Sequence, residues 1–286
     1  MRLIKTFLTL GSLYVILFAT QSNVSSCQKP PEIIRDTVII RDTIRIVDST
    51  SCNCYDLKDG LVAWYNFKGG TLKDSSGNNN NIILNNSAVL APDRFGKANN
   101  AFQFNGTSSY MRVAHSASLN PSPAITMAAI VKVTGFYAGN CTTSHLFGKG
   151  ATEHVNGSYN LRVFSTVGCN APVDVTKELF AGLYGDDNPH KASANSTDFI
   201  QTNKWISVVY TYENNESKMY IDGVLKRTVT HTAGLITFTP NIQDLFIGKE
   251  DDTTYPYWFT GVIDDIRIYN KALCAAAVTQ LYNLSE

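Results

Sequence analysis

The stretch GVIDDIRIYNKAL, residues 261–273, has the alternation of a β-strand. Every second residue faces the same side, so one face carries Val262, Asp264, Ile266 and Ile268. This face is apolar apart from Asp264. Because a buried carboxylate without a partner is costly, we expect Asp264 to have a partner elsewhere in the chain. The opposite face places Asp265 and Arg267 together as an exposed ion pair.

From residue 57 onward, the chain consists of short alternating runs separated by Gly, Asn, Asp and Ser. Asp222-Gly223 lies between two such runs, and this pair favours the type I′ turn of a β-hairpin. Only residues 271–283, KALCAAAVTQLYN, have a helical pattern. We therefore expect residues 57–286 to form one all-β domain, a two-sheet antiparallel jelly-roll sandwich with a short C-terminal helix.

Residues 1–26 have the features of an export signal. Basic residues precede an apolar run over residues 7–19 that is too short to span a bilayer. The run leads to VSSC, residues 24–27, which resembles the lipobox of bacterial lipoproteins and implies that Cys27 is lipidated. Ordinary signal cleavage, which would leave Cys27 as a thiol, is the alternative. We expect an exported protein at the outer membrane or cell surface, in contact with the membrane only through its lipid.

Residues 27–56 are expected to be an extended tether between the lipid and the domain. The sequence IRDT occurs at residues 34–37 and again at residues 40–43, in a segment rich in β-branched side chains. Two prolines near its start stiffen the chain and disfavour a helix there. A brief coiled-coil stalk is the alternative, because apolar residues also recur seven apart.

The charge balance argues against nucleic acid as a partner. The chain has 24 basic and 24 acidic side chains, and its formal net charge is zero. Proteins that bind nucleic acids usually carry a basic surface. The composition is otherwise that of an ordinary globular protein.

An exported protein can form disulfide bonds. Cys141 and Cys169 lie in segments rich in Gly and Asn, and we expect them to pair. Cys52 and Cys54 lack a second cysteine or histidine pair that would make a metal site, so a bridge from one of them to Cys274 is favoured. Apart from the lipobox cysteine the number is odd, and one thiol can stay free.

Three segments in order resemble the LamG-like (laminin G type 3) jelly rolls of the concanavalin A-like lectin/glucanase superfamily. They are residues 60–113, with a DSSGN loop, an RFG turn and an FNG strand end; residues 205–225, a Trp-led strand followed by a hairpin; and residues 246–273. The resemblance covers residues 57–284. Bacteria of the Bacteroidetes type commonly carry such domains on surface lipoproteins, which is consistent with the N-terminal features.

The resemblance implies that the first strand lies beside the 261–273 strand, so that the Asp74 loop reaches Asp264. The loop DSSGNNNN supplies a carboxylate and amide oxygens, which are ligands that calcium prefers. A structural calcium site is therefore expected, with these ligands: Asp74, Asn78, Asn80 and Asp264. In the alternative, Asp264 accepts hydrogen bonds from backbone amides of that loop, with no ion.

The superfamily includes glycosidases, which use two carboxylates and often carry them on a Glu-x-Asp-x-x-Glu strand. The nearest match, residues 250–255, lacks the final Glu and lies in a turn-like segment. No other catalytic motif is present. We therefore expect no catalytic residues and no enzymatic activity, and a glycoside hydrolase is the less favoured reading.

A binding module for a polysaccharide or glycan is the favoured function. Recognition of sugars uses exposed aromatic rings beside polar groups. The segment DDTTYPYWF, residues 251–259, provides the candidate ligand-binding residues Tyr255, Tyr257, Trp258, Asp251 and Asp252. The alternative for Trp258 is a core position at the start of the next strand, as we expect for Trp64 and Trp205. A protein-binding adhesin or scaffold is the alternative function.

Overall fold

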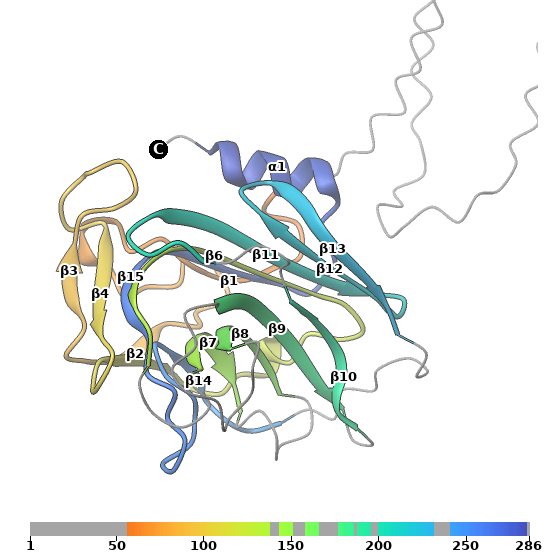
Figure 1. The fold of residues 1–286 in the computed structure, drawn as a ribbon, viewed down its shortest axis with the longest axis horizontal. Coiled ribbons are helices and arrows are strands. Elements are labelled where there is room, and N and C mark those ends of the chain that lie inside the picture. Colours follow the sequence, from red (N-terminus) through yellow and green to blue (C-terminus); the bar gives the residue numbers. More distant parts are fainter. Residues whose placement is uncertain are drawn as a thin grey trace, which may run out of the picture.

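The computed structural model describes residues 56–137, 143–150, 158–165, 177–185, 188–195, 200–231 and 241–284. In these ranges the chain forms two antiparallel β-sheets packed face to face, with a single α-helix on the outside (Figure 1). This confirms the predicted sandwich with a short C-terminal helix. None of the helices in these ranges has the length and apolar character needed to cross a membrane.

The first sheet has eight strands in the order β13-β12-β11-β6-β15-β4-β3, with β1 paired to β15. Its strands are β1 (Leu61–Tyr65), β3 (Val89–Ala91), β4 (Ala101–Asn105), β6 (Ile125–Gly135), β11 (Trp205–Glu213), β12 (Glu216–Ile221), β13 (Val224–Thr230) and β15 (Thr260–Tyr269). Asp222 and Gly223 connect β12 to β13 with φ of 50° and 74°, so the predicted tight hairpin is present.

The second sheet has seven strands in the order β10-β9-β8-β7-β14-β5-β2. Its strands are β2 (Ile82–Asn86), β5 (Tyr110–Val113), β7 (Ser144–Lys149), β8 (Tyr159–Ser165), β9 (Lys177–Gly185), β10 (Asn188–Asn195) and β14 (Leu245–Ile247). Two short 3₁₀ helices, η1 (Lys68–Gly70) and η2 (Ala117–Leu119), lie in the connections.

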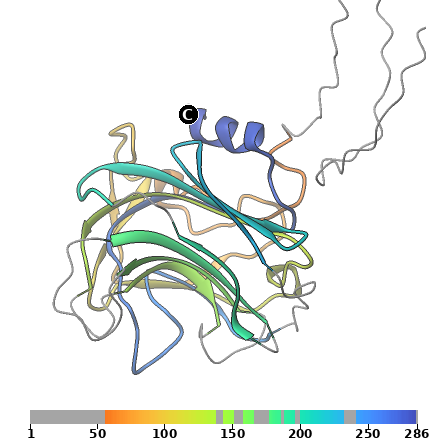
Figure 2. The ribbon, with the colours of Figure 1, turned by 45° about the vertical axis from the view of Figure 1, so that its right-hand side comes forward.

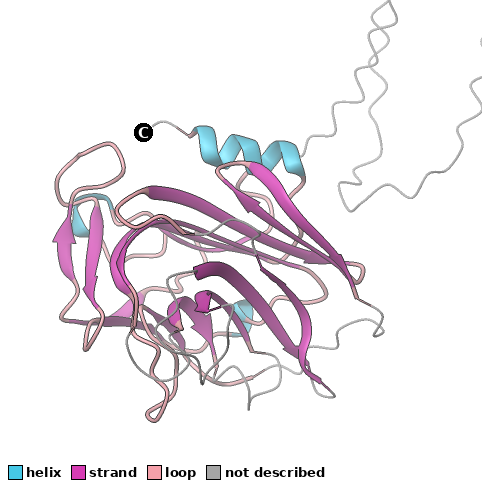
Figure 3. Cartoon of the chain, viewed as in Figure 1, coloured by secondary structure: helices cyan, strands magenta, loops and turns pink. Residues whose placement is uncertain are grey.

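The main core lies between the sheets, because each strand turns alternate apolar side chains inward. The helix α1 (Ala275–Asn283) covers part of the outer face of the eight-stranded sheet (Figure 3). Its Val278 and Leu281 pack with Val209 and Tyr220 in a second, smaller core. Polar and aromatic side chains lie on the rest of that outer face.

A β-bulge in β15 changes the face on which Asp264 lies. The register of β15 against β6 shifts between Ile263 and Asp265. Ile263, Ile266 and Ile268 therefore belong to the main core, and Asp264 does not share their face. The predicted alternation is wrong at this point. One extra residue in the strand turns the side chains that precede it to the opposite face of the sheet.

Candidate functional site

The predicted ligand-binding segment forms a projecting turn, residues 248–259, beyond strand β14. Two backbone hydrogen bonds close it, from Phe259 N to Gly248 O at 2.9 Å and from Glu250 N to Pro256 O at 2.8 Å. Within the turn, Asp252 Oδ1 accepts the amides of Thr254 and Tyr255. Asp252 therefore shapes the turn, since an Asp side chain that binds amides two and three residues later stabilises a turn.

The aromatic side chains of this turn stack on one another and on the neighbouring strand. The rings of Tyr255 and Tyr257 are parallel at 6.1 Å, and Tyr257 lies parallel to the His145 ring at 5.9 Å. Tyr137 meets Tyr257 edge-on. Tyr255, which ends the stack, is 41% exposed. The stack therefore holds an aromatic ring open to solvent in a fixed position.

Trp258 lies on the outer face of the seven-stranded sheet, half-buried, while Phe259 is in the core. The Trp258 ring is 6.1 Å from that of Tyr110. Lys249 Nζ lies 5.2 Å from the Tyr110 ring, 5.0 Å from Phe246 and 5.5 Å from Trp258. Burial lowers the pKa of Lys249, while Asp251 opposes that shift.

The carboxylates closest to a glycosidase motif have structural surroundings. Glu250 is buried, and its Oε2 lies 3.2 Å from Nε2 of His145, which is also buried. Burial lowers the pKa of His145 well below its usual value, and the charge of Arg162 lowers it further. Burial also raises the pKa of Asp251. Glu250 is thus packed inside the turn, away from a substrate that would bind at the surface.

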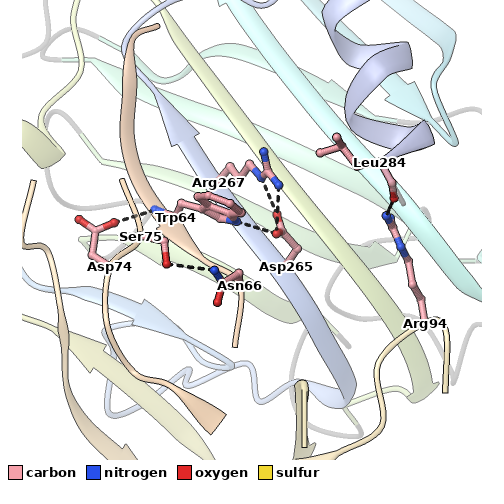
Figure 4. Close-up of polar contacts among 8 residues, drawn as sticks. All are labelled: Trp64, Asn66, Asp74, Ser75, Arg94, Asp265, Arg267 and Leu284. Atoms are coloured by element: carbon pink, nitrogen blue, oxygen red, sulfur yellow. Dashed lines mark hydrogen bonds and ion pairs between the residues drawn. The ribbon is translucent and has the colours of Figure 1, made fainter. Parts of the chain in front are cut away.

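A second group of polar and aromatic side chains lies on the outer face of the eight-stranded sheet (Figure 4). Asp265 accepts a hydrogen bond from Trp64 Nε1 at 2.7 Å. It also accepts Arg267 Nε at 2.9 Å and Nη2 at 3.4 Å. The Arg267 guanidinium lies 4.3 Å from the centre of the Trp64 ring. The expected exposed pair of Asp265 and Arg267 is therefore largely buried under Trp64, because the outer face is partly covered.

The turn 74–78 fixes strand β1 beneath this group. Asp74 Oδ1 accepts the amides of Trp64 and Ser76 at 2.9 and 2.8 Å. Its Oδ2 accepts Asn80 N at 3.0 Å and the Ser76 hydroxyl at 2.8 Å. Ser75 Oγ accepts Asn66 Nδ2 (Figure 4). Asp74 thus acts as a cap for several backbone donors.

The structure does not assemble the expected calcium ligands. Asp74 has both oxygens occupied by protein donors, and the side-chain amides of Asn78 and Asn80 donate to the Val62 carbonyl. Asp264 accepts the Arg94 amide of the RFG turn at 3.3 Å, so its partner is not the Asp74 loop. In the described residues, no three His, Cys, Asp or Glu side chains gather as a metal site. These expected ligands do not meet in the described residues, and the calcium site stays a prediction.

A hollow of about 280 Å³ opens beside the Trp64 group. Its walls come from β1, β6, β11 and β15, from the end of α1, and from the turn that carries Arg94 and Phe95. A neighbouring hollow of about 390 Å³ is lined by Trp205, Asp222 and Tyr282, and Arg94 and Phe95 border both. Trp64 and Trp205 therefore lie at the outer face, half-buried, rather than in the core as predicted.

The alternation of the sequence places Asp265 and Arg267 on the face away from the core, but it does not show that Asp264 and Trp64 join them there. Asp264 joins them because of the bulge, and Trp64 because β1 pairs with β15. Five cysteines lie outside the described residues, so their predicted roles stay predictions: Cys27, Cys52, Cys54, Cys141 and Cys169. Cys274, the described cysteine, is half-buried and precedes α1.

A family model described as "Concanavalin A-like lectin/glucanases superfamily" (laminin G type 3) matches residues 105–279, more than half of the chain. The chain belongs to this superfamily. No curated protein matches the sequence significantly. The family match agrees with the two antiparallel sheets and confirms the resemblance inferred from the sequence motifs.

Solved structures share the superfamily fold at low identity. Domain 4 of AbnA, a GH43 extracellular arabinanase from Geobacillus stearothermophilus determined with arabinotriose, has a TM-score of 0.53 at 23% identity, covering 78% of this chain and 98% of that one. The binding domain of Paraclostridial Mosquitocidal Protein 1 has a TM-score of 0.58 at 17% identity, covering 79% and 52%.

A structure of botulinum neurotoxin type C has a TM-score of 0.54 at 16% identity, and the match covers 79% of this chain and 51% of that one. Cell entry of that toxin is described as dependent on interaction with two ganglioside molecules. This superfamily member thus spans about half the length of the two toxin chains. At these identities the likeness shows the fold alone.

Proposed function

We propose that this protein is a non-catalytic, surface-anchored module that binds carbohydrate through the turn 248–259. The observation that carries the proposal is the set of aromatic rings on this turn: Tyr255 stacks on Tyr257, and Trp258 lies beside Lys249, whose charge interacts with Asp251. Sugar rings have an apolar face that packs on aromatic rings, and their hydroxyls need polar neighbours. The turn offers both.

Carbohydrate as the ligand class is supported by what the structural neighbours bind. The arabinanase domain was determined with arabinotriose, and the neurotoxin is described with gangliosides. Arabinotriose is a saccharide and gangliosides carry saccharide headgroups, although each ligand belongs to its own protein. Fold alone does not assign a ligand, so the proposal depends on the aromatic surface.

The absence of catalysis is supported by the surroundings of the acidic residues in the turn. A glycosidase needs two carboxylates that flank the scissile bond and can exchange protons with it. Glu250 is buried against His145, and Asp252 binds backbone amides of its own turn. We therefore expect no release of reducing ends from β-glucans or galactans.

Anchoring is proposed from the N-terminal sequence, through a lipid on Cys27 and the tether 27–56. A Cys27→Ser variant is expected to move from the membrane fraction to the soluble fraction without a change in melting temperature. Sedimentation of that variant with membranes would contradict the anchor. This test is independent of the ligand.

A protein-binding adhesin or scaffold is the second candidate. It is favoured by large apolar side chains on the edge strands β2 and β3, where Ile83 is 55% and Val89 58% exposed. Exposed apolar side chains on sheet edges suit contact with another protein. Ile83 and Val89 do not belong to the turn 248–259, so mutation can distinguish the two.

A glycan array with the mature protein tests the proposed function. Tyr255→Ala and Trp258→Ala should each weaken binding of the glycans that the wild type retains, by about tenfold, which corresponds to roughly 1.4 kcal/mol. Ile83→Ala, a matched change of an exposed apolar side chain on β2, should leave binding unchanged. A wild type that binds no glycan would remove the carbohydrate proposal in favour of the adhesin.

A further inference from the structure

The two adjacent carboxyl groups of β15, Asp264 and Asp265, differ in the number of hydrogen bonds that they accept. Asp265 accepts three hydrogen bonds, from Trp64 and Arg267. Asp264 is only 5% exposed, and among the described residues the Arg94 amide is its one hydrogen-bond donor, at 3.3 Å from Oδ2. Its other oxygen, Oδ1, has no donor from the described protein. A buried carboxyl normally has more partners than this.

The bulge places this open oxygen at a cavity rather than in the core. Both Asp264 and Asp265 line the 280 Å³ hollow. In a regular strand they would face opposite sides, so the extra residue brings both carboxyls to one surface. Since Asp265 is already occupied by Trp64 and Arg267, Asp264 is the group that can receive a donor from a ligand.

An aromatic ring stands at the mouth of the same hollow. Phe95 is 55% exposed, and the Arg94 guanidinium lies 4.6 Å from the centre of its ring. Arg94 Nη2 also donates to the Leu284 carbonyl at the end of α1, which fixes the turn against the helix (Figure 4). The mouth therefore presents an apolar face with N–H donors beside it.

The chemistry of the walls selects a small hydroxylated ligand. Arg267 forms an ion pair with Asp265. Asp264 is therefore the carboxyl group that remains to face Arg94, and Lys58 and Lys68 also line the hollow. The volume is just below the usual range for ligand pockets, which suits one ring rather than a long chain. A hydroxyl can donate to Asp264 and accept from Arg94, while the ring's apolar face covers Phe95.

We propose that this hollow is a second saccharide-binding site, which holds a single sugar residue between Phe95 and the carboxyl of Asp264. The site goes beyond the proposed function, because it lies across the sandwich from the turn 248–259. In both ribbon views, α1 and that turn are on opposite sides of the molecule (Figures 1 and 2). Two such sites would let one module hold two glycan chains, with a gain in avidity on a polymer.

The test compares the mature wild-type protein with three variants on an array of mono- to tetrasaccharides that includes arabinotriose. Phe95→Ala and Asp264→Asn change the hollow, and Trp258→Ala changes the turn. Phe95 is exposed, so Phe95→Ala should fold normally even if a change at Asp264 does not. Ile242→Ala, which truncates another exposed apolar residue away from the hollow, is the matched control.

We expect at least one glycan to be retained by Trp258→Ala and weakened about tenfold by both Phe95→Ala and Asp264→Asn. If Trp258→Ala abolishes all binding while both hollow variants match the wild type, the second site is overturned and the proposed function stands. Weakening by Asp264→Asn without any effect of Phe95→Ala also overturns it. A wild type that binds no glycan overturns both proposals.

Discussion

The turn 248–259 and the outer face of the eight-stranded sheet use aromatic side chains in different ways. In the turn, Tyr255 and Tyr257 stack on each other, and backbone hydrogen bonds hold the loop. On the sheet, Trp64 donates a hydrogen bond to Asp265 and lies over Arg267, so it is part of the packing that stabilises the fold. We therefore expect that exposed rings in a closed turn can be changed with little effect on stability, whereas rings held between strands cannot.

The largest expected effect is that of Trp64→Ala, which should lower the free energy of unfolding by about 3 kcal/mol. The variant loses the packing of the indole and the hydrogen bond from Trp64 Nε1, so that Asp265 keeps only its donors from Arg267. Urea denaturation measures this, with Tyr255→Ala as the control from the turn, expected within about 0.5 kcal/mol of wild type. Equal losses for both variants would contradict the comparison.

The next effect concerns Asp74, which holds the backbone of β1 under Trp64. Asp74→Ala should cost about 2 kcal/mol, because it leaves three partly buried amides without acceptors. The same experiment with a chelator tests calcium: EDTA should leave the wild-type melting temperature unchanged. A clear drop with EDTA, reversed by added calcium, would restore the calcium site. Asp251→Ala in the turn is the control.

A third effect depends on pH. Burial raises the pKa of Asp264 to about 7, although the Arg94 amide lowers it and Asp265 raises it. Because this pKa is above that of the unfolded chain, the folded protein holds an extra proton between the two values, and stability falls as pH rises toward and through 7. From pH 5 to 8, wild type should lose roughly 2 kcal/mol relative to Asp264→Asn. Parallel curves would show that Asp264 does not titrate in this range.

The smallest effect is expected for Lys249→Met, which removes a charge from the rings of Tyr110, Phe246 and Trp258. A partly exposed cation beside aromatic rings contributes about 0.5–1 kcal/mol, and the methionine keeps most of the packing. Thermal unfolding should therefore change little. A loss of stability as large as that of Trp64→Ala would mean that the turn stabilises the fold as strongly as the outer face of the sheet does.

The fold could be predicted from the sequence because its signals are local and repeated. Alternation marked the strands, Asp222-Gly223 marked a hairpin, and the helical pattern marked α1. The projecting turn was predicted too, since Pro256 and the acidic residues break the strands on either side. These features depend on neighbours within a few residues.

The outer-face site could not be predicted because it depends on the count of residues in one strand. A single extra residue at Asp264 reverses which side chains face outward, and no local signal marks it. The same holds for Trp64, whose alternation suggested a core position. Its partner Asp265 lies 201 residues further along the chain, and only the paired strands bring the two together.

The pairing of β1 with β15 also has a consequence for how the chain folds. Leu61 is registered with Tyr269, so the eight-stranded sheet closes only after almost the whole domain has been synthesised. Contacts between such distant segments slow folding, because the long loop must be ordered first. Until then, one edge of β6 and one edge of β4 are without their neighbour β15. The newly made chain therefore depends on protection from aggregation until its last strand arrives.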